Sequence, residues 1–317
     1  MLDLAIIIVN YRTPSVTTEC LASILPEASE YSIGVVVVDN ASGDNSVSLI
    51  EDWCKINDSN SIINVISSAE NLGFSGGNNI GIKSVHAKYY LLLNSDTLLH
   101  KDALKILIET ASKSPKAGLV TPMLIGPDGS PQESCFNFMT PVSEFISAAR
   151  TGFVYKILSK FTIPLPITNE TSSPPWSSFA CVLIRSEVFN DIGLLDDGFF
   201  MYYEDAEFCY RARKAGWDII NEPSAQVIHL GGMSSSFNDD LKSRKRTPRY
   251  LYESRARFFY ILYGRAGLLA ANLLWLLGRI ISKSIQCMGR SNKAIPHKQW
   301  LDIWINFLNP LARGRKL

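Results

Sequence analysis

The chain has 317 residues, of which 46% are hydrophobic and 19% are charged. This is the composition of an ordinary globular protein, so it excludes a disordered or fibrous chain and fits one large α/β domain or two smaller ones. The net charge of +1 hides an asymmetry, because residues 241–317 hold 16 Lys/Arg against two acidic residues, leaving 15 basic and 28 acidic side chains in residues 1–240. Such opposed halves predict a catalytic body with a basic appendage that binds an anionic surface.

The six cysteines are scattered, and no two form a C-x-x-C pair. They predict neither a zinc site nor a disulfide scaffold and fit a reducing, cytoplasmic compartment. The apolar start Leu4–Val9 is too short for a secretory signal and lacks its basic beginning, so we interpret it as a first buried strand. No uncharged apolar run reaches about 18 residues, which argues against a conventional membrane span. We therefore expect any membrane contact to be peripheral.

Short runs of β-branched residues alternate with helical patterns through the first half of the chain. This alternation is typical of a mostly parallel sheet covered by helices. A first helix is expected after Thr13, a plausible N-cap followed by Pro14. The predicted strands are Leu4–Val9, Ile33–Val38, Asn64–Ser67, Tyr89–Leu93 and Gly118–Pro122, and the further helices are Asp44–Trp53, Gly77–Val85 and Asp102–Ser114.

Residues 137–175 interrupt this alternation with five prolines, which predicts a long excursion or flap. Regular structure is expected to return with a strand at Cys181–Arg185, a short helix at Ser186–Ile192 and a helix at Glu204–Ala215 that Gly216 ends. From Thr247 onward the pattern becomes helical and basic.

Polar side chains end three of the predicted strands. Ligands of open α/β sheets bind beyond the carboxyl ends of the strands, so these positions are candidates for a binding site. Each alone is also explained as a turn or a helix cap, whereas three on one sheet edge favour a nucleotide site. The residues are Asn10 and Tyr11, Asp39 and Asn40, and Asn94, Ser95 and Asp96.

The segment Asn71–Asn79 is rich in glycine and enters a helix, where backbone amides can approach phosphate or sugar oxygens. Its spacing is neither G-x-G-x-x-G nor G-K-[ST], so a Rossmann dehydrogenase and a P-loop enzyme both lose support. Downstream, Phe199–Phe208 concentrates aromatics and carboxylates at the start of a predicted helix. Acidic residues there can serve chemistry or merely complement the helix dipole.

Taken in order, these motifs resemble the inverting glycosyltransferases of family 2, over roughly residues 4–235. The chain is most similar to bacterial rhamnosyltransferase-like members, which build cell-surface polysaccharides. The resemblance implies a GT-A fold for residues 1–240, an α/β fold with a mostly parallel twisted sheet flanked by helices, and leaves 241–317 as a C-terminal helical, basic region. The motifs are Val9-Asn10-Tyr11, Val38-Asp39-Asn40-Ala41-Ser42, Asn71-x-Gly73-Phe74, Asn94-Ser95-Asp96 and Tyr203-Glu204-Asp205.

The resemblance also implies roles for the acidic residues. Asp205 matches the catalytic base, with Glu204 and Glu207 as competitors, and because neighbours on a helix point differently, only one of Glu204 and Asp205 should face the pocket. Asp96 matches a ligand of a divalent cation, Mg²⁺ or Mn²⁺, held by the donor diphosphate. Asn94 replaces the first Asp of the familiar D-x-D motif, which implies a weaker metal site. His229 matches a position that can add an imidazole ligand, although a lone His after a strand is often structural.

For the donor, Asp39 resembles the residue that recognises a pyrimidine ring through its N3–H, which uracil and thymine share. Trp176 and Glu204 are expected in the sugar and acceptor pocket. Phe179 stands there where many members of the family have glycine, so the resemblance does not define which sugar is transferred. The other expected donor contacts are Asn10, Tyr11, Asn40, Asn71, Gly73, Phe74, Asn78 and Ser95.

These roles predict transfer of a sugar, first of all L-rhamnose from dTDP-rhamnose, to a lipid-linked or polysaccharide acceptor on the inner face of the bacterial plasma membrane. A UDP-sugar donor, a nucleotidyltransferase and a catalytically silent nucleotide- or glycan-binding protein are the alternatives. The basic C-terminal region either packs on the catalytic domain or meets an anionic membrane. Nucleic acid is not an expected partner, because no nucleic-acid-binding fold accompanies the charge.

Overall fold

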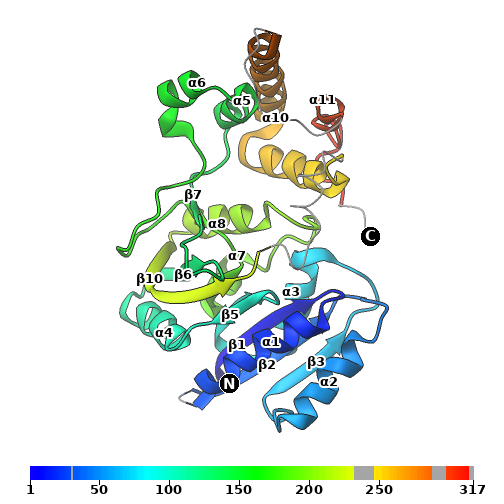
Figure 1. Ribbon diagram of the computed structural model, residues 1–317, viewed down its shortest axis with the longest axis vertical. Coiled ribbons are helices and arrows are strands. Elements are labelled where there is room, and N and C mark those ends of the chain that lie inside the picture. Colours follow the sequence, from blue (N-terminus) through cyan, green and yellow to red (C-terminus); the bar gives the residue numbers. More distant parts are fainter. Residues whose placement is uncertain (30, 232–245, 288–297, 314–317) are drawn as a thin grey trace.

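A computed structural model describes residues 1–29, 31–231, 246–287 and 298–313. These residues form an eight-stranded sheet in the order β3-β2-β1-β4-β9-β6-β10-β5, while β7 and β8 form a separate pair (Figure 1). The strands are β1 (Leu2–Asn10), β2 (Ile33–Asp39), β3 (Ile63–Ser67), β4 (Ala87–Asn94), β5 (Thr97–Leu99), β6 (Ala117–Ile125), β7 (Cys135–Phe136), β8 (Trp176–Ser177), β9 (Cys181–Arg185) and β10 (Asp218–His229).

The sheet is mostly parallel, as predicted. Strands β3, β2, β1 and β4 run parallel to one another, β6 and β10 are parallel neighbours, and β9 is antiparallel to both β4 and β6. Because β9 is antiparallel to both of its neighbours, β4 and β6 run in the same direction. The carboxyl ends of β1, β2, β4 and β10 therefore lie at one edge of the sheet. The short strand β5 and the full length of β10 were not predicted.

Helices cover both faces of the sheet (Figure 1). Alternate residues of β1 enter different cores: Ile6 and Ile8 pack on one face, and Ala5 and Ile7 on the other. The helices are α1 (Pro14–Ile24), α2 (Ser46–Ile56), α3 (Gly73–Ser84), α4 (Ala103–Lys113), α5 (Pro141–Ala149), α6 (Gly152–Ile157), α7 (Ser186–Ile192), α8 (Glu204–Lys214), α10 (Arg249–Cys287) and α11 (Gln299–Asp302).

Two helix boundaries correct or qualify the sequence prediction. Helix α3 begins at Gly73 rather than at Gly77, so most of the glycine-rich segment lies within the helix and not in a loop before it. Helix α1 begins at Pro14 as predicted, but the side chain of Thr13 makes no capping hydrogen bond. It instead donates weakly to Asn10 Oδ1 at 3.4 Å. Helix α8 ends as predicted, with Gly216 at φ +90°.

The predicted excursion at 137–175 contains two helices that sequence analysis missed. Helix α5 begins with a capping box, in which Thr140 accepts from the Ser143 N–H and the Ser143 hydroxyl accepts from the Thr140 N–H. It packs along α10. The prolines that suggested irregular structure include Pro141, which occupies the first turn of α5, where a proline is tolerated.

Helix α10 departs from helical geometry at Gly264, where φ is +65° and ψ is −171°. Its first half contributes the buried side chains Phe258 and Phe259 to the core on the sheet face that also holds Ala5 and Ile7. Its second half projects beyond the sheet beside α5 (Figure 1). The expected domain boundary at 240/241 falls within residues 232–245, which lie outside the described residues.

Among the described residues, Arg249–Gln286 forms one helix that by length and composition alone is apolar enough to cross a membrane. The sequence expectation required an uncharged run, whereas here Arg265 and Arg279 flank an apolar stretch. A core helix of a soluble protein passes the same test, but only 28% of the most apolar 18-residue window is buried. The rest of this window is half-buried or exposed among the described residues.

Candidate active site

The carboxylate of Asp39 is held rigidly at the carboxyl end of β2. Asn10, its partner in the β1–β2 register, donates to Asp39 Oδ1 at 2.7 Å. The Ser42 hydroxyl donates to the same oxygen at 2.5 Å, and the Ser42 N–H donates to Oδ2 at 3.1 Å. Thr17 donates to Asn10 Oδ1 at 2.9 Å, which fixes the orientation of the Asn10 amide. Asn10 and Asp39, predicted as donor contacts, are thus neighbours, while Ser42 was not singled out although it lies within the motif.

The Asn40 side chain joins the end of β2 to the start of α3. Its amide nitrogen donates to Asn71 Oδ1 and to Gly73 O, each at 3.0 Å, and its oxygen accepts from the Leu72 N–H at 3.0 Å. Asn71 Oδ1 also accepts from the Gly73 N–H. These polar groups satisfy one another, so Asn40 and Asn71 shape the backbone beside the Asp39 cluster.

The remaining predicted donor residues lie around this cluster. Tyr11 follows β1 and is half-buried, with the Arg12 guanidinium 5.0 Å from its ring centre. Asn78, on α3, is buried and donates to the Phe74 carbonyl at 2.9 Å. Phe74 is half-buried beside it, and Ser95 is buried in the turn after β4.

Asp96 and His229 come together at the same sheet edge. His229 Nε2 lies 3.7 Å from Asp96 Oδ1, and the Leu230 N–H donates to the Asp96 carbonyl at 2.9 Å. Gln132 holds the imidazole from the other side. Its amide nitrogen donates to the His229 carbonyl at 2.9 Å, and its oxygen lies 3.1 Å from Nδ1. The amide oxygen can only accept, so Nδ1 donates in this contact, and Nε2 is the ring nitrogen that faces Asp96.

One oxygen and one nitrogen donor at this spacing fit two ligands of a divalent cation, and the Gln132 contact is the outer-shell support that ligating histidines usually have. The described residues hold no cluster of three or more His, Cys, Asp or Glu side chains suited to a metal. Further ligands would therefore come from diphosphate and water oxygens. Asp96 and His229 thus fit the predicted metal role, and Gln132 is a supporting residue that sequence analysis missed.

Asp205 and Glu204 open α8, and they differ in exposure. Glu204 is 6% exposed, and its Oε2 has no hydrogen-bond partner among the described residues. Burial, followed by the charge of Asp205, raises its pKa well above the usual range. Asp205 is half-buried, and burial raises its pKa to about 6, while hydrogen bonds from the Ala206 and Phe179 backbone limit the rise. Asp205 therefore has the pKa of a general base that works near neutral pH.

The segment Phe179–Ala180 joins Asp205 to the strand end that carries Asp96. The backbone of Phe179 bonds the Asp205 carboxylate, and the Ala180 carbonyl accepts from the Asn94 N–H at 2.9 Å. This contact continues the antiparallel pairing of β4 with β9. The Asp205 carboxylate and the strand end that precedes Asp96 thus lie on either side of one short stretch of backbone.

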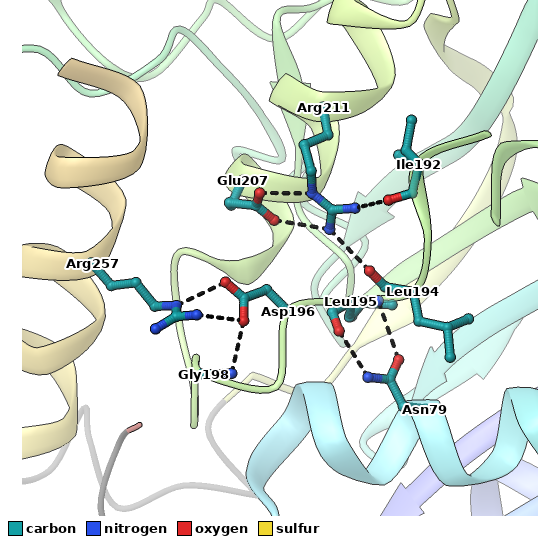
Figure 2. A network of polar contacts seen from close by, with 9 residues as sticks. All are labelled: Asn79, Ile192, Leu194, Leu195, Asp196, Gly198, Glu207, Arg211 and Arg257. Atoms are coloured by element: carbon teal, nitrogen blue, oxygen red, sulfur yellow. Dashed lines mark hydrogen bonds and ion pairs between the residues drawn. The ribbon is translucent and has the colours of Figure 1, made fainter. Parts of the chain in front are cut away.

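The loop 193–203, which leads into α8, is held by three separate elements (Figure 2). From α3, Asn79 exchanges two hydrogen bonds with the Leu195 backbone. From α8, Arg211 pairs with Glu207 and donates to the Ile192 and Leu194 carbonyls. From α10, Arg257 forms a bidentate pair with Asp196 at 2.7 and 2.8 Å. Glu207, a competitor for the role of base, is instead engaged by Arg211.

Trp176, predicted in the sugar pocket, is 8% exposed and stacks on Phe136 with 4.4 Å between ring centres. Its indole N–H donates to the Asn137 carbonyl at 2.9 Å.

A cavity of 270 Å³ is lined by Gln132, Met123, Asn221 and the prolines at 166, 174 and 175. It opens behind the residue that supports His229 and contains neither Asp205 nor Asp39.

The fold defines an α/β protein of the GT-A type, whose sheet edge carries a held carboxylate at one strand end and an Asp–His pair at another, with the Asp205 carboxylate at the start of α8. Residues 5–163 match the model of "Glycosyl transferase family 2", and residues 89–288 match "Glycosyl transferase family group 2". The chain belongs to glycosyl transferase family 2, which confirms the resemblance, and is a glycosyltransferase.

Known proteins similar to this chain agree with that class. A "Low-salt glycan biosynthesis hexosyltransferase Agl10" of Haloferax volcanii is 32% identical over 230 residues, covering 71% of this chain and 66% of that protein. An "N-acetylglucosaminyl-diphospho-decaprenol L-rhamnosyltransferase" of Mycobacterium tuberculosis is 24% identical, covering 91% and 94%. Among solved structures, mannosyltransferase PcManGT of Pyrobaculum calidifontis, in complex with GDP-Man and Mn²⁺, has a TM-score of 0.55 at 14% identity, covering 98% and 86%, which supports the fold.

Proposed function

We propose that this enzyme transfers a sugar, with inversion, from a pyrimidine nucleotide donor to a hydroxyl group of a lipid-linked glycan. L-Rhamnose from dTDP-rhamnose is the first candidate. The name of the mycobacterial relative, which specifies L-rhamnose and a diphospho-decaprenol acceptor, supports this choice over 91% of the chain. A UDP-sugar is the alternative donor, because a carboxylate at Asp39 accepts equally from the N3–H of uracil or thymine.

One observation carries the proposal: Asp205 and the Asn94–Asp96 turn flank the same two residues, Phe179 and Ala180. A base must lie near the anomeric carbon, and the donor diphosphate is attached to that carbon. A glycosidase would need a second carboxyl as general acid, whereas a nucleoside diphosphate leaves without protonation. The Asp96–His229 pair, which fits a cation that a diphosphate can also bind, therefore favours transfer from a nucleotide donor over glycoside hydrolysis.

In the proposed reaction, Asp205 accepts the proton of the acceptor hydroxyl while that oxygen forms a bond to the anomeric carbon. The bond from this carbon to the diphosphate oxygen breaks, and its electron pair leaves with the nucleoside diphosphate. Asp96 and His229 would hold a Mg²⁺ or Mn²⁺ ion. When bound, such an ion neutralises charge that develops on the leaving diphosphate. Asn10 and Ser42 hold Asp39 in place to accept from the base ring.

A thermal-shift panel of dTDP-, UDP- and GDP-sugars with Mn²⁺ tests the donor class, and slow donor hydrolysis distinguishes an enzyme from a silent binding protein. We expect stabilisation by pyrimidine nucleotides and not by GDP-sugars. The variant Asp205→Asn should lose transfer by about 100-fold or more while donor binding persists. Asp52→Asn, at an exposed position on α2, is the matched control. Full transfer by Asp205→Asn would remove this residue as the base.

The proposal places residues 1–240 as the catalytic domain and the enzyme on the cytoplasmic side of a membrane, where a lipid-linked acceptor would be met. The exposed apolar side chains on the second half of α10, such as Leu273 and Ile280, support contact with a bilayer.

A further inference from the structure

The second half of α10 exposes an apolar stripe. Its other side packs closely on α5, so closely that a Cβ at Gly278 would lie 2.6 Å from the Phe145 carbonyl oxygen. Side chains spaced three or four residues apart share one face of a helix, and this face points away from α5. The stripe consists of Leu269, Leu273, Leu277 and Ile280, which are 40%, 52%, 47% and 62% exposed.

Helix α6 adds a second exposed apolar group at the same end of the molecule. Phe153, Tyr155 and Ile157 are 76%, 57% and 60% exposed. Helix α5 lies between α6 and the second half of α10 (Figure 1). We call residues 145–163 and 265–287, which contain most of α5, all of α6 and the second half of α10, the projecting end. Its apolar side chains thus lie on both sides of the α5–α10 pair.

The projecting end is also basic. Neither residues 145–163 nor residues 254–287 contain an Asp or Glu. Two of its arginines are brought near each other, because Gly278 packs against the backbone of Ala149 and each of these residues is followed by an arginine, Arg279 and Arg150. Burial first and the charge of Arg150 second lower the pKa of Arg279. The basic residues are Arg150, Lys156, Lys160, Arg265, Arg279 and Lys283.

We propose that the projecting end docks on a bilayer that contains anionic lipids, with its apolar side chains entering the interface and Arg150 and Arg279 binding lipid phosphates. A second copy of the chain fits less well. Two copies would bring basic residues against each other without acidic partners, and one two-fold interface would cover apolar residues on only one side of the pair. A fluid interface covers both sides.

Co-sedimentation of the full chain with vesicles tests the docking. We expect binding to phosphatidylcholine vesicles that contain phosphatidylglycerol, and weaker binding to phosphatidylcholine alone or at high salt. The double variant Leu273→Glu/Ile280→Glu should reduce binding by at least about tenfold, because charged groups replace inserted apolar ones. Arg150→Ala/Arg279→Ala should cost about fivefold for each charge, on anionic vesicles only.

Leu49→Glu is the matched control, since Leu49 on α2 is 45% exposed at the opposite end of the molecule. It should bind vesicles as the unaltered chain does. Absence of binding to any vesicle, or full binding by Leu273→Glu/Ile280→Glu, would overturn the proposal. So would a dimer in sedimentation velocity that this double variant dissociates, if vesicles are not bound.

This inference rests on the proposed function, because the lipid-linked acceptor is part of that proposal. Vesicle binding can nevertheless be measured without turnover. Vesicle binding without any pyrimidine-nucleotide stabilisation would retain the docking and reject the function. Donor stabilisation and donor hydrolysis without vesicle binding would retain the function and reject the docking.

Discussion

The backbone N–H of Phe74 donates a 2.8 Å hydrogen bond to the carbonyl oxygen of Phe200. This bond joins the first turn of α3, beside the Asp39 cluster, to the loop that leads into Asp205. The approach is possible because Gly73 has φ +68° and no side chain; a Cβ there would lie 1.9 Å from the Phe200 oxygen. The part of the candidate site around Asp39 and the part around Asp205 are therefore in direct backbone contact.

Gly73→Ala should destabilise the protein by about 3 kcal/mol, from the left-handed backbone and the forced displacement of Phe200. Gly129→Ala is the control, because Gly129 has φ +79° but open space around it, and should cost about 1 kcal/mol. Urea unfolding of both variants gives the comparison. Equal losses would show that the Phe200 contact yields without cost.

The transfer rate should depend on the protonation of Asp205. A base with a pKa of about 6 is mostly ionised at pH 7 and mostly protonated at pH 5. The rate at saturating donor should therefore fall about tenfold between these values, with unit slope, as pH decreases. Donor binding measured over the same range separates this effect from loss of the donor. A rate that stays constant down to pH 5 would contradict the assignment.

Ser42→Ala should weaken nucleotide binding by about tenfold, because a hydrogen bond to a charged group typically contributes about 1.5–3 kcal/mol and Asp39 would lose the one from the hydroxyl. Isothermal titration with the nucleoside diphosphate measures the change. Ser48→Ala, at an exposed position on α2, serves as the control. Unchanged affinity in Ser42→Ala would show that Asn10 alone suffices to place Asp39.

Gln132→Ala should reduce Mn²⁺ affinity by about 10- to 100-fold, since the imidazole of His229 would lose the acceptor that fixes its tautomer. Electron paramagnetic resonance of free Mn²⁺ measures this without turnover. Gln132→Glu keeps an acceptor for Nδ1 and should retain more affinity than the alanine variant. If both variants bind Mn²⁺ like the unaltered chain, Gln132 does not position a metal ligand.

The strands and their polar ends were predictable because both signals are local. Runs such as Val35–Val38 are buried on both faces, and the residue that ends each run is placed by the strand itself. The order β4-β9-β6 was not predictable, since β9 enters between strands that are earlier in the chain. The start of α3 at Gly73 depends on Phe200, a contact between residues 127 positions apart in sequence.

The candidate site shows the same difference between local signals, which sequence analysis can detect, and contacts between distant residues, which it cannot. Asp39, Asp96 and Asp205 were predicted from motifs and stay predictions, but most of the residues that contact this part of the structure are distant in sequence and carry no local signal. Gln132, for example, donates a hydrogen bond to the His229 carbonyl, although the two residues are 97 positions apart in the sequence. Glu207 and Arg211 have the spacing of a helical ion pair, yet nothing local shows that Arg211 also holds the Ile192 and Leu194 carbonyls. Helices α5 and α6 were not predicted, because the prolines of residues 137–175 indicated irregular structure.

The ion pair between Arg257 and Asp196 has a consequence for any attempt to isolate a minimal catalytic fragment. Asp196 belongs to the loop before Asp205, and Arg255 likewise forms a buried pair with Glu144 on α5. A chain cut before α10 would leave both carboxylates without their arginine partners. It would also remove Phe258 and Phe259 from the core. The sheet and α10 are therefore one structural unit, and a chain that loses the helix would lose the contact that holds the loop before Asp205.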